Sequence, residues 1–193
     1  MKKTVLITLM ALAAAGIVQA DRTVNETRPL DPNGRVEIEN IAGKVEVVGW
    51  SGDGVSVTGR LDNAVEELVI SRGGSRLSID VELEHRSGYS GNAYLTVKIP
   101  TTASVYVETI SADITVDGVD GEVELESVSG KVEVSGRPSL LEAASVSGNV
   151  VATATAGRSE LESVSGDVIV RSASGRLEAG SVSGNIEIEG GEL

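Results

Sequence analysis

The tetrapeptide Ser-Val-Ser-Gly occurs four times in the second half of this 193-residue chain, always 18 residues apart. The copies begin at Ser127, Ser145, Ser163 and Ser181, and Thr109 begins a degenerate copy one period earlier. A fixed period is typical of repeat proteins, in which a short unit buries its apolar face only by stacking on the next unit. The repeat therefore constrains the fold more strongly than any local pattern.

Each repeat contains two segments in which apolar and polar residues alternate, which is the periodicity of a β-strand. In one repeat, the first segment carries Val123 and Leu125, and the second carries Val132 and Val134. Turn residues such as Gly136 separate one repeat from the next. The pattern thus predicts that each repeat forms a strand, a tight corner, a second strand and a looser turn.

The valine of Ser-Val-Ser-Gly determines where the corner is expected. Leu125 and Val128 are both apolar but lie three residues apart, so the alternation changes phase between them. If both side chains face the interior, Glu126 and Ser127 form the corner. The equivalent apolar residues then make one inward-facing column: Ile110, Val128, Val146, Val164 and Val182.

The sequence therefore predicts an all-β fold, a parallel β-solenoid with 18-residue coils of two short strands and an antiparallel β insertion near its N-terminal end. A hexapeptide β-helix is excluded because its third face would need apolar residues where Glu122 and Arg158 stand. A calcium-binding roll needs Gly-Gly-x-Gly-x-Asp repeats, and Lys131 occupies a position where such a roll would need a calcium ligand.

One domain is expected over residues 21–193, with a polar, extended lead-in over residues 21–32. Residues 34–47 resemble one repeat and predict a first coil, and the regular coils occupy residues 103–188. The insertion, residues 49–100, breaks the period. Its Arg72-Gly73-Gly74-Ser75 segment is typical of a hairpin turn. Residues 61–69 also fit a helix pattern, with Asn63 and Glu66 as a capping pair, but the neighbouring hairpin favours strands.

Residues 1–20 have the pattern of a secretory signal peptide. Lys2 and Lys3 precede an apolar stretch that is too short to span a bilayer, and cleavage is expected before Asp21. The chain contains no cysteine, so an exported form would rely on its core rather than on disulfides. We therefore expect an exported protein, periplasmic or extracellular at the cell surface, with no membrane insertion after the signal is removed.

The chain is acidic, with a formal net charge of −13. This charge argues against nucleic acid as a partner. Four glutamates recur at the repeat spacing and predict one outward column: Glu124, Glu142, Glu160 and Glu178. Neighbouring strands lie about 4.8 Å apart, so the like charges repel unless cations or the nearby Arg158 and Arg176 relieve them. These glutamates are the candidate metal ligands, and a solvated face screened by salt is the alternative.

Catalytic residues are not expected, and neither is a cofactor. His85 is the only histidine, and the serines recur in every coil, as corner geometry would produce. All the aromatic residues except Tyr106 precede the regular coils, so a ligand site, if present, is expected at Trp50 and Tyr89 with His85 and Arg86. The alternative is an exposed hairpin loop without function.

The sequence resembles the DUF4097 family of bacterial proteins, described as putative adhesins. The resemblance rests on three features: Val97-Lys98-Ile99-Pro100, Val105-Tyr106-Val107-Glu108-Thr109, and the repeated Ser-Val-Ser-Gly. It covers residues 34–188, and the degenerate Ser111-Ala112 departs from the usual Ser-Gly. The resemblance implies the architecture and an adhesin label, but no catalytic residues.

These observations predict an exported, non-enzymatic surface or envelope protein, an adhesin-like binding scaffold for a protein or glycan of the cell envelope. One alternative is a cation-dependent structural module of the periplasm, and a polysaccharide-acting enzyme ranks last. The last coil lacks its second strand, so end-to-end pairing of two copies through that coil is a further expectation. Glu187 and Glu189 on its final strand would instead act only as charges that protect an edge.

Overall fold

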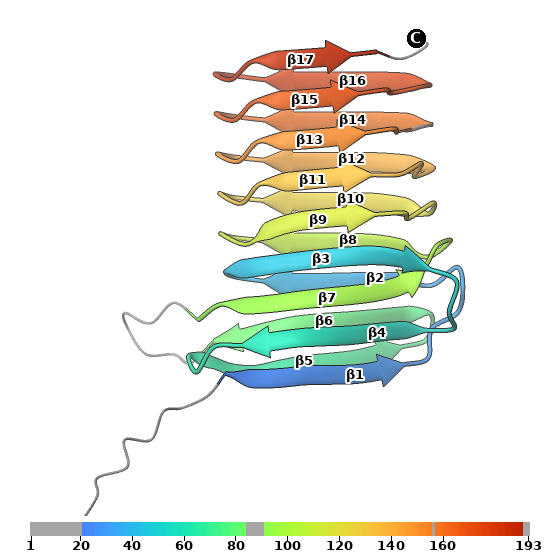
Figure 1. Cartoon of the computed structure of the whole chain (residues 1–193), viewed down its shortest axis with the longest axis vertical. Coiled ribbons are helices and arrows are strands. Elements are labelled where there is room, and N and C mark those ends of the chain that lie inside the picture. The colour runs from blue at the N-terminus through green and yellow to red at the C-terminus, as the bar shows by residue number, and fades with distance from the viewer. Residues whose placement is uncertain (1–20, 84–90, 156, 191–193) are drawn as a thin grey trace, which may run out of the picture.

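The structure is a computed structural model that describes residues 21–83, 91–155 and 157–190. Its described residues form strands and turns and contain no helix, so the expected all-β class is confirmed. Two mostly parallel sheets face each other (Figure 1). The nine-stranded sheet consists of β1 (Arg22–Arg28), β4 (Val55–Leu61), β7 (Ala93–Pro100), β3 (Gly43–Trp50), β9 (Asp113–Asp117), β11 (Val132–Ser135), β13 (Val150–Thr153), β15 (Val168–Arg171) and β17 (Ile186–Glu189), in that spatial order. The eight-stranded sheet consists of β16 (Arg176–Ser181), β14 (Arg158–Ser163), β12 (Leu140–Ser145), β10 (Glu122–Ser127), β8 (Ser104–Thr109), β2 (Arg35–Asn40), β6 (Arg76–Leu83) and β5 (Val65–Gly73).

The register in the C-terminal half follows the sequence repeat. In one sheet Val123 pairs with Leu141, and in the other Val132 pairs with Val150, so equivalent residues of successive repeats lie side by side. All four side chains are buried between the sheets. Because the inward-facing positions along the strands are mostly valine, leucine, isoleucine and alanine, the interior is a continuous apolar layer along the stack.

The N-terminal segment extends this stack. Strand β2 pairs with β8 and β3 pairs with β9, both in parallel, so the N-terminal segment that resembles one repeat lies directly against the strands of the regular repeats. The lead-in expected over residues 21–32 is instead partly a strand, because β1 pairs with β4 along its whole length. Residues 65–73 form β5, and Gly73 pairs with Arg76 across a two-residue turn. The strand interpretation of this region is confirmed, and the helix alternative is wrong.

The expectation of an antiparallel insertion is correct only in part. The pairs β5–β6, β4–β7 and β1–β4 are antiparallel, but β6 lies parallel to β2 and β7 lies parallel to β3. Strand β6 directs Leu77 and Ile79 inward and β7 directs Leu95 and Val97 inward. These side chains continue the apolar layer of β2 and β3. Their burial therefore favours β6 and β7 as further strands of the two sheets rather than as parts of a separate hairpin.

The predicted corner at Glu126 and Ser127 is wrong. Strand β10 continues to Ser127, whose side chain faces inward and is only 6% exposed, and the turn begins at Val128. Val128 lies outside and is 46% exposed. The strand alternation therefore runs unbroken through Val123, Leu125 and Ser127. A buried serine is tolerated here because its hydroxyl is hydrogen-bonded.

The hydrogen bonds of Ser163 show what the repeated tetrapeptide does. Its Oγ accepts a hydrogen bond from the Gly166 N–H at 2.9 Å and donates one to the carbonyl oxygen of Gly148, in the preceding turn, at 3.1 Å. Ser145 and Ser181 repeat this arrangement. In these three repeats the first serine of the tetrapeptide therefore closes its own turn and joins that turn to the one before it.

We expect Ser163→Ala to reduce the free energy of unfolding by about 1–3 kcal/mol, because the Gly166 N–H and the Gly148 carbonyl lose a buried partner. Urea denaturation followed by circular dichroism measures the change. Ser165→Ala is the matched control, since Ser165 belongs to the same turn but is exposed. Equal losses in the two variants would contradict the role given to the buried hydroxyl.

Candidate binding groove

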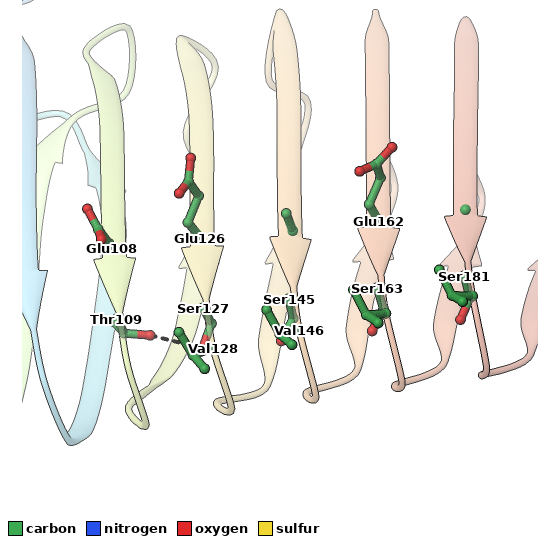
Figure 2. A pocket seen from close by; sticks show the side chains of 14 residues that line it. Glu108, Thr109, Glu126, Ser127, Val128, Ser145, Val146, Glu162, Ser163 and Ser181 are labelled. Atoms are coloured by element: carbon green, nitrogen blue, oxygen red, sulfur yellow. Dashed lines mark hydrogen bonds between the residues drawn. The ribbon is translucent and has the colours of Figure 1, made fainter.

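An open groove runs across five neighbouring strands of the eight-stranded sheet, next to the turns formed by Ser-Val-Ser-Gly (Figure 2). It encloses about 480 Å³. Residues of β8, β10, β12, β14 and β16, together with the turn valines, line it: Glu108, Thr109, Glu126, Ser127, Val128, Ala144, Ser145, Val146, Glu162, Ser163, Val164, Gly180, Ser181 and Val182. We call this hollow the valine groove.

One side of the valine groove is a row of exposed valines. Val128, Val146 and Val164 are 46%, 47% and 46% exposed, and Val182 in the last turn is 79% exposed. Single exposed apolar residues are ordinary on protein surfaces, but side chains from successive turns that form a continuous row are not. Ile110 continues this valine row into an adjoining hollow beside Glu39.

The other side of the groove carries carboxylates. Glu108 pairs with Glu126, Glu126 pairs with Ala144, and Ala144 pairs with Glu162 across neighbouring strands. We call Glu108, Glu126 and Glu162 the glutamate row. In the described parts of the chain, none of the three forms an ion pair with a lysine or arginine. One side of the valine groove is therefore apolar, and the other side carries carboxylates whose negative charge no described lysine or arginine neutralises.

Tyr106 lies one column away from the glutamate row and donates a hydrogen bond from its hydroxyl to Oε2 of Glu108 at 3.0 Å. Burial, followed by this hydrogen bond and the charges of Glu126, Glu108 and Glu39, raises the pKa of Tyr106 to about 12. The phenol therefore stays protonated and remains a donor. Arg35 lies over its ring, with the guanidinium carbon 5.7 Å from the ring centroid.

Glu39 extends the acidic column beyond Glu108, with which it pairs across β2 and β8. Desolvation, and then the charges of Asp80, Glu108 and Glu37, raises the pKa of Glu39 above its ordinary value of 4.5. The folded chain therefore holds this proton at a pH where the unfolded chain has lost it. Ionisation of Glu39 makes the fold less stable as the pH rises from about 4.5 through the folded-state pKa.

We expect Glu39→Gln to raise the melting temperature at pH 7 relative to the unaltered chain, and most of the gain to be lost at pH 4, where Glu39 is mostly protonated in both states. Thermal denaturation at the two pH values measures it. Glu122→Gln, on the same face, reports the general effect of removing one negative charge. A gain from Glu39→Gln that is equally large at pH 4 would contradict this explanation.

A sequence model of the family described as Toastrack DUF4097 matches residues 33–193. The chain belongs to the Toastrack DUF4097 family. The resemblance read from its motifs is thereby confirmed. Among curated proteins, no significant match is found.

Two solved structures show that this Toastrack fold occurs in distant proteins. A putative adhesin from Parabacteroides distasonis ATCC 8503 superposes with a TM-score of 0.57 at 12% identity, covering 86% of this chain and 73% of its own. A putative cell adhesion protein from Clostridium sporogenes ATCC 15579 superposes with a TM-score of 0.54 at 10% identity, covering 90% of this chain and 100% of its own. At such low identity the likeness extends to the fold alone.

The predicted glutamate column of this Toastrack chain does exist. Glu124, Glu142, Glu160 and Glu178 pair in sequence across β10, β12, β14 and β16. Arg35 forms an ion pair with Glu124, between Nη2 and Oε2 at 3.0 Å, and Arg158 forms one with Glu160 at 3.4 Å. Within the described ranges, no group of three or more His, Cys, Asp or Glu side chains has the geometry to hold a metal ion. Metal binding by this column remains a prediction.

Of the aromatic site expected at Trp50, Tyr89, His85 and Arg86, only Trp50 lies within the described residues. Trp50 is half-buried, donates a hydrogen bond from Nε1 to the Gly54 carbonyl at 3.1 Å, and pairs with Pro100 at the end of β3. Tyr89, His85 and Arg86 lie outside the described residues. Ala93, which follows their segment, pairs with Gly43 at the opposite end of β3.

Sequence reasoning missed the valine groove although both of its rows were visible. Hydrophobicity places the valines in the core because they are apolar, and the column of Glu108, Glu126 and Glu162 does not stand out in the sequence because Ala144 and Gly180 interrupt it. The strand alternation of Val123, Leu125 and Ser127 was the available signal, since it places Glu126 and Val128 outside.

In the described part of this Toastrack chain, no helix is both long enough and apolar enough to cross a membrane.

Proposed function

We propose that this protein is an exported, non-enzymatic interaction scaffold of the cell envelope, adhesin-like in that it binds a partner through its surface. The valine groove carries the proposal, because it repeats an apolar and an acidic side chain along one line of the surface. A surface row of this kind supports recognition of an elongated partner more readily than chemistry at one point. The proposal includes the signal peptide at residues 1–20 and a parallel β-solenoid of 18-residue coils as its scaffold.

Family membership and the two distant structures support a surface or envelope role. Both of those proteins are described by name as adhesion proteins. The location is tested by treating intact cells with protease, beside fractionated cells as a control. Cleavage from outside supports the cell surface. Protection until the envelope is opened places the protein in the periplasm, and adhesion to external surfaces is then abandoned in favour of an envelope partner.

The binding role is tested with the triple variant Val128→Ser, Val146→Ser, Val164→Ser. We expect binding of the labelled chain to isolated cell envelopes to fall at least fivefold, because the apolar side of the groove becomes polar. Val151→Ser with Ile169→Ser is the matched control, since these paired residues are partly exposed on the other sheet. Unchanged binding by the triple variant, with its melting temperature preserved, would remove the valine groove from the proposal.

Pairing of two copies through the C-terminal coil belongs to the same proposal. Ile186 and Ile188 on β17 are 45% and 50% exposed, although their equivalents in the preceding strands, Val168 and Val170, are buried. A second copy that covers β16 and β17 would bury this apolar surface. Analytical ultracentrifugation of the full-length chain tests the pairing, and Ile188→Lys is expected to abolish any dimer.

A further inference from the structure

The dimensions of the valine groove restrict what it can hold. Its two sides come from residues two apart along the chain, such as Glu126 in β10 and Val128 in the turn that follows, whose Cα atoms lie about 7 Å apart in extended backbone, so its width is about 7 Å. It crosses five strands, and four strand steps of about 4.8 Å give a length of about 19 Å. An α-helix with side chains is about 10–12 Å across and is too wide. A single extended chain of about six residues fits.

The sheet leaves this chain no backbone partners on the groove floor. Strand β12 pairs with both β10 and β14, and β8, β10 and β14 are likewise paired on both sides. An added β-strand needs a free sheet edge, which a groove on a sheet face does not offer. A polyproline II segment keeps its backbone in water and needs no such edge. The occupant that suits the groove is therefore an extended polyproline II segment.

The glutamate row specifies the charge and the spacing of that segment. Glu126 and Glu162 lie two strand steps apart, which is about 9.6 Å. Three residues of polyproline II advance about 9.3 Å and return to the same face. Residues two apart on a β-strand advance only about 6.8 Å. A basic residue at every third position thus places its charges opposite the two carboxylates.

Resting on the proposed function, we propose that the valine groove binds a basic, proline-rich segment of a partner protein, in polyproline II conformation and with Lys or Arg at every third position. Its apolar residues pack on Val128, Val146 and Val164, and its cations approach Glu126 and Glu162. The charge of the groove disfavours phosphate-rich or carboxylate-rich ligands.

The test uses a fluorescent nine-residue peptide with three consecutive Lys-Pro-Pro units and its isomer of equal composition, in which the lysines alternate with prolines. We expect the full-length chain to bind the first peptide at least fivefold more tightly, by fluorescence anisotropy at 0.05 M salt, and binding to weaken at 0.3 M salt. Equal affinity for the isomer would overturn the proposed spacing, and with it the proposal.

Two double variants locate the peptide. Glu126→Gln with Glu162→Gln is expected to weaken binding about fivefold or more. Glu142→Gln with Glu178→Gln makes the same charge change at the same spacing in the neighbouring column, and should leave the affinity within twofold. Equal weakening by both pairs would show attraction to the whole acidic face and overturn the proposal. All variants must keep their melting temperatures to be compared.

Two further outcomes would overturn this inference. If spermidine displaces the peptide, depends on Glu126 and Glu162 and binds with the affinity of the peptide, the ligand is a polyamine. Failure of both peptides to bind, while the chain still binds envelopes through Val128, Val146 and Val164, would refute the basic proline-rich partner and leave the proposed function intact. Loss of the envelope binding itself would instead be the failure of the proposed function.

Discussion

Replacing Gly148 by alanine is expected to destabilise the fold by about 3 kcal/mol, the upper end of the range for inserting a methyl group where there is no space. A Cβ at this position would lie 1.9 Å from the carbonyl oxygen of Gly130 and 2.6 Å from its carbonyl carbon. The obstacle is backbone of the preceding turn, so no side-chain rotation relieves it. For a chain of this length the loss corresponds to roughly 6–12 °C in melting temperature.

Two other glycines provide controls for Gly148→Ala. A Cβ added at Gly180 meets nothing within 4 Å, so Gly180→Ala is expected to be neutral or slightly stabilising. Gly184→Ala creates the same close approach, 2.0 Å from the Gly166 carbonyl oxygen, but in the last turn, where only β17 must shift. We expect its cost to be smaller than that of Gly148→Ala. If Gly148→Ala were as harmless as Gly180→Ala, close stacking of the turns would not explain the glycine of the repeat.

The strands and their stacking were predictable because they depend on a long-range regularity. Alternation identifies the strands, and the constant period by itself places Val123 beside Leu141, as the structure has them. Whether β6 and β7 run parallel or antiparallel to β2 and β3 was not predictable in the same way. A period-2 pattern such as Leu77 and Ile79 records which face is buried but not the direction of the neighbouring strand.

The valine groove could not be predicted from hydrophobicity. Val128 resembles Val132 in chemistry, yet one is exposed and the other is buried. The difference in their exposure depends on Ser127. Its hydroxyl accepts a hydrogen bond from the Gly130 N–H at 2.9 Å and can therefore lie in the interior. This hydrogen bond depends on turn geometry, which the sequence does not state. Ser127 is polar but buried and Val128 is apolar but exposed, so hydrophobicity alone assigns both residues to the wrong side.

The stacked architecture makes position along the stack as important as residue type, and Leu141→Ala with Leu177→Ala tests this. The two leucines belong to one inward column, but Leu141 is fully buried in β12 and Leu177 is only partly buried in β16. We expect Leu141→Ala to cost about 2–5 kcal/mol, because the turns on both sides hold the cavity open. Leu177→Ala is expected to cost about 1 kcal/mol, since its side chain buries less apolar surface.

Hydrogen exchange tests the same gradient without substitution. In a stack of repeats, each unit is stabilised only by its neighbours, so opening begins at an end with one neighbour missing. Amide protons of β16 and β17 are expected to exchange faster than those of β10 and β11, which are flanked on both sides. Uniform protection, together with equal losses from the two leucine variants, would mean that the sheets open as a single unit. A chain that opens from its C-terminal end would keep the turns bearing Val128 and Val146 assembled, and these form the centre of the valine groove.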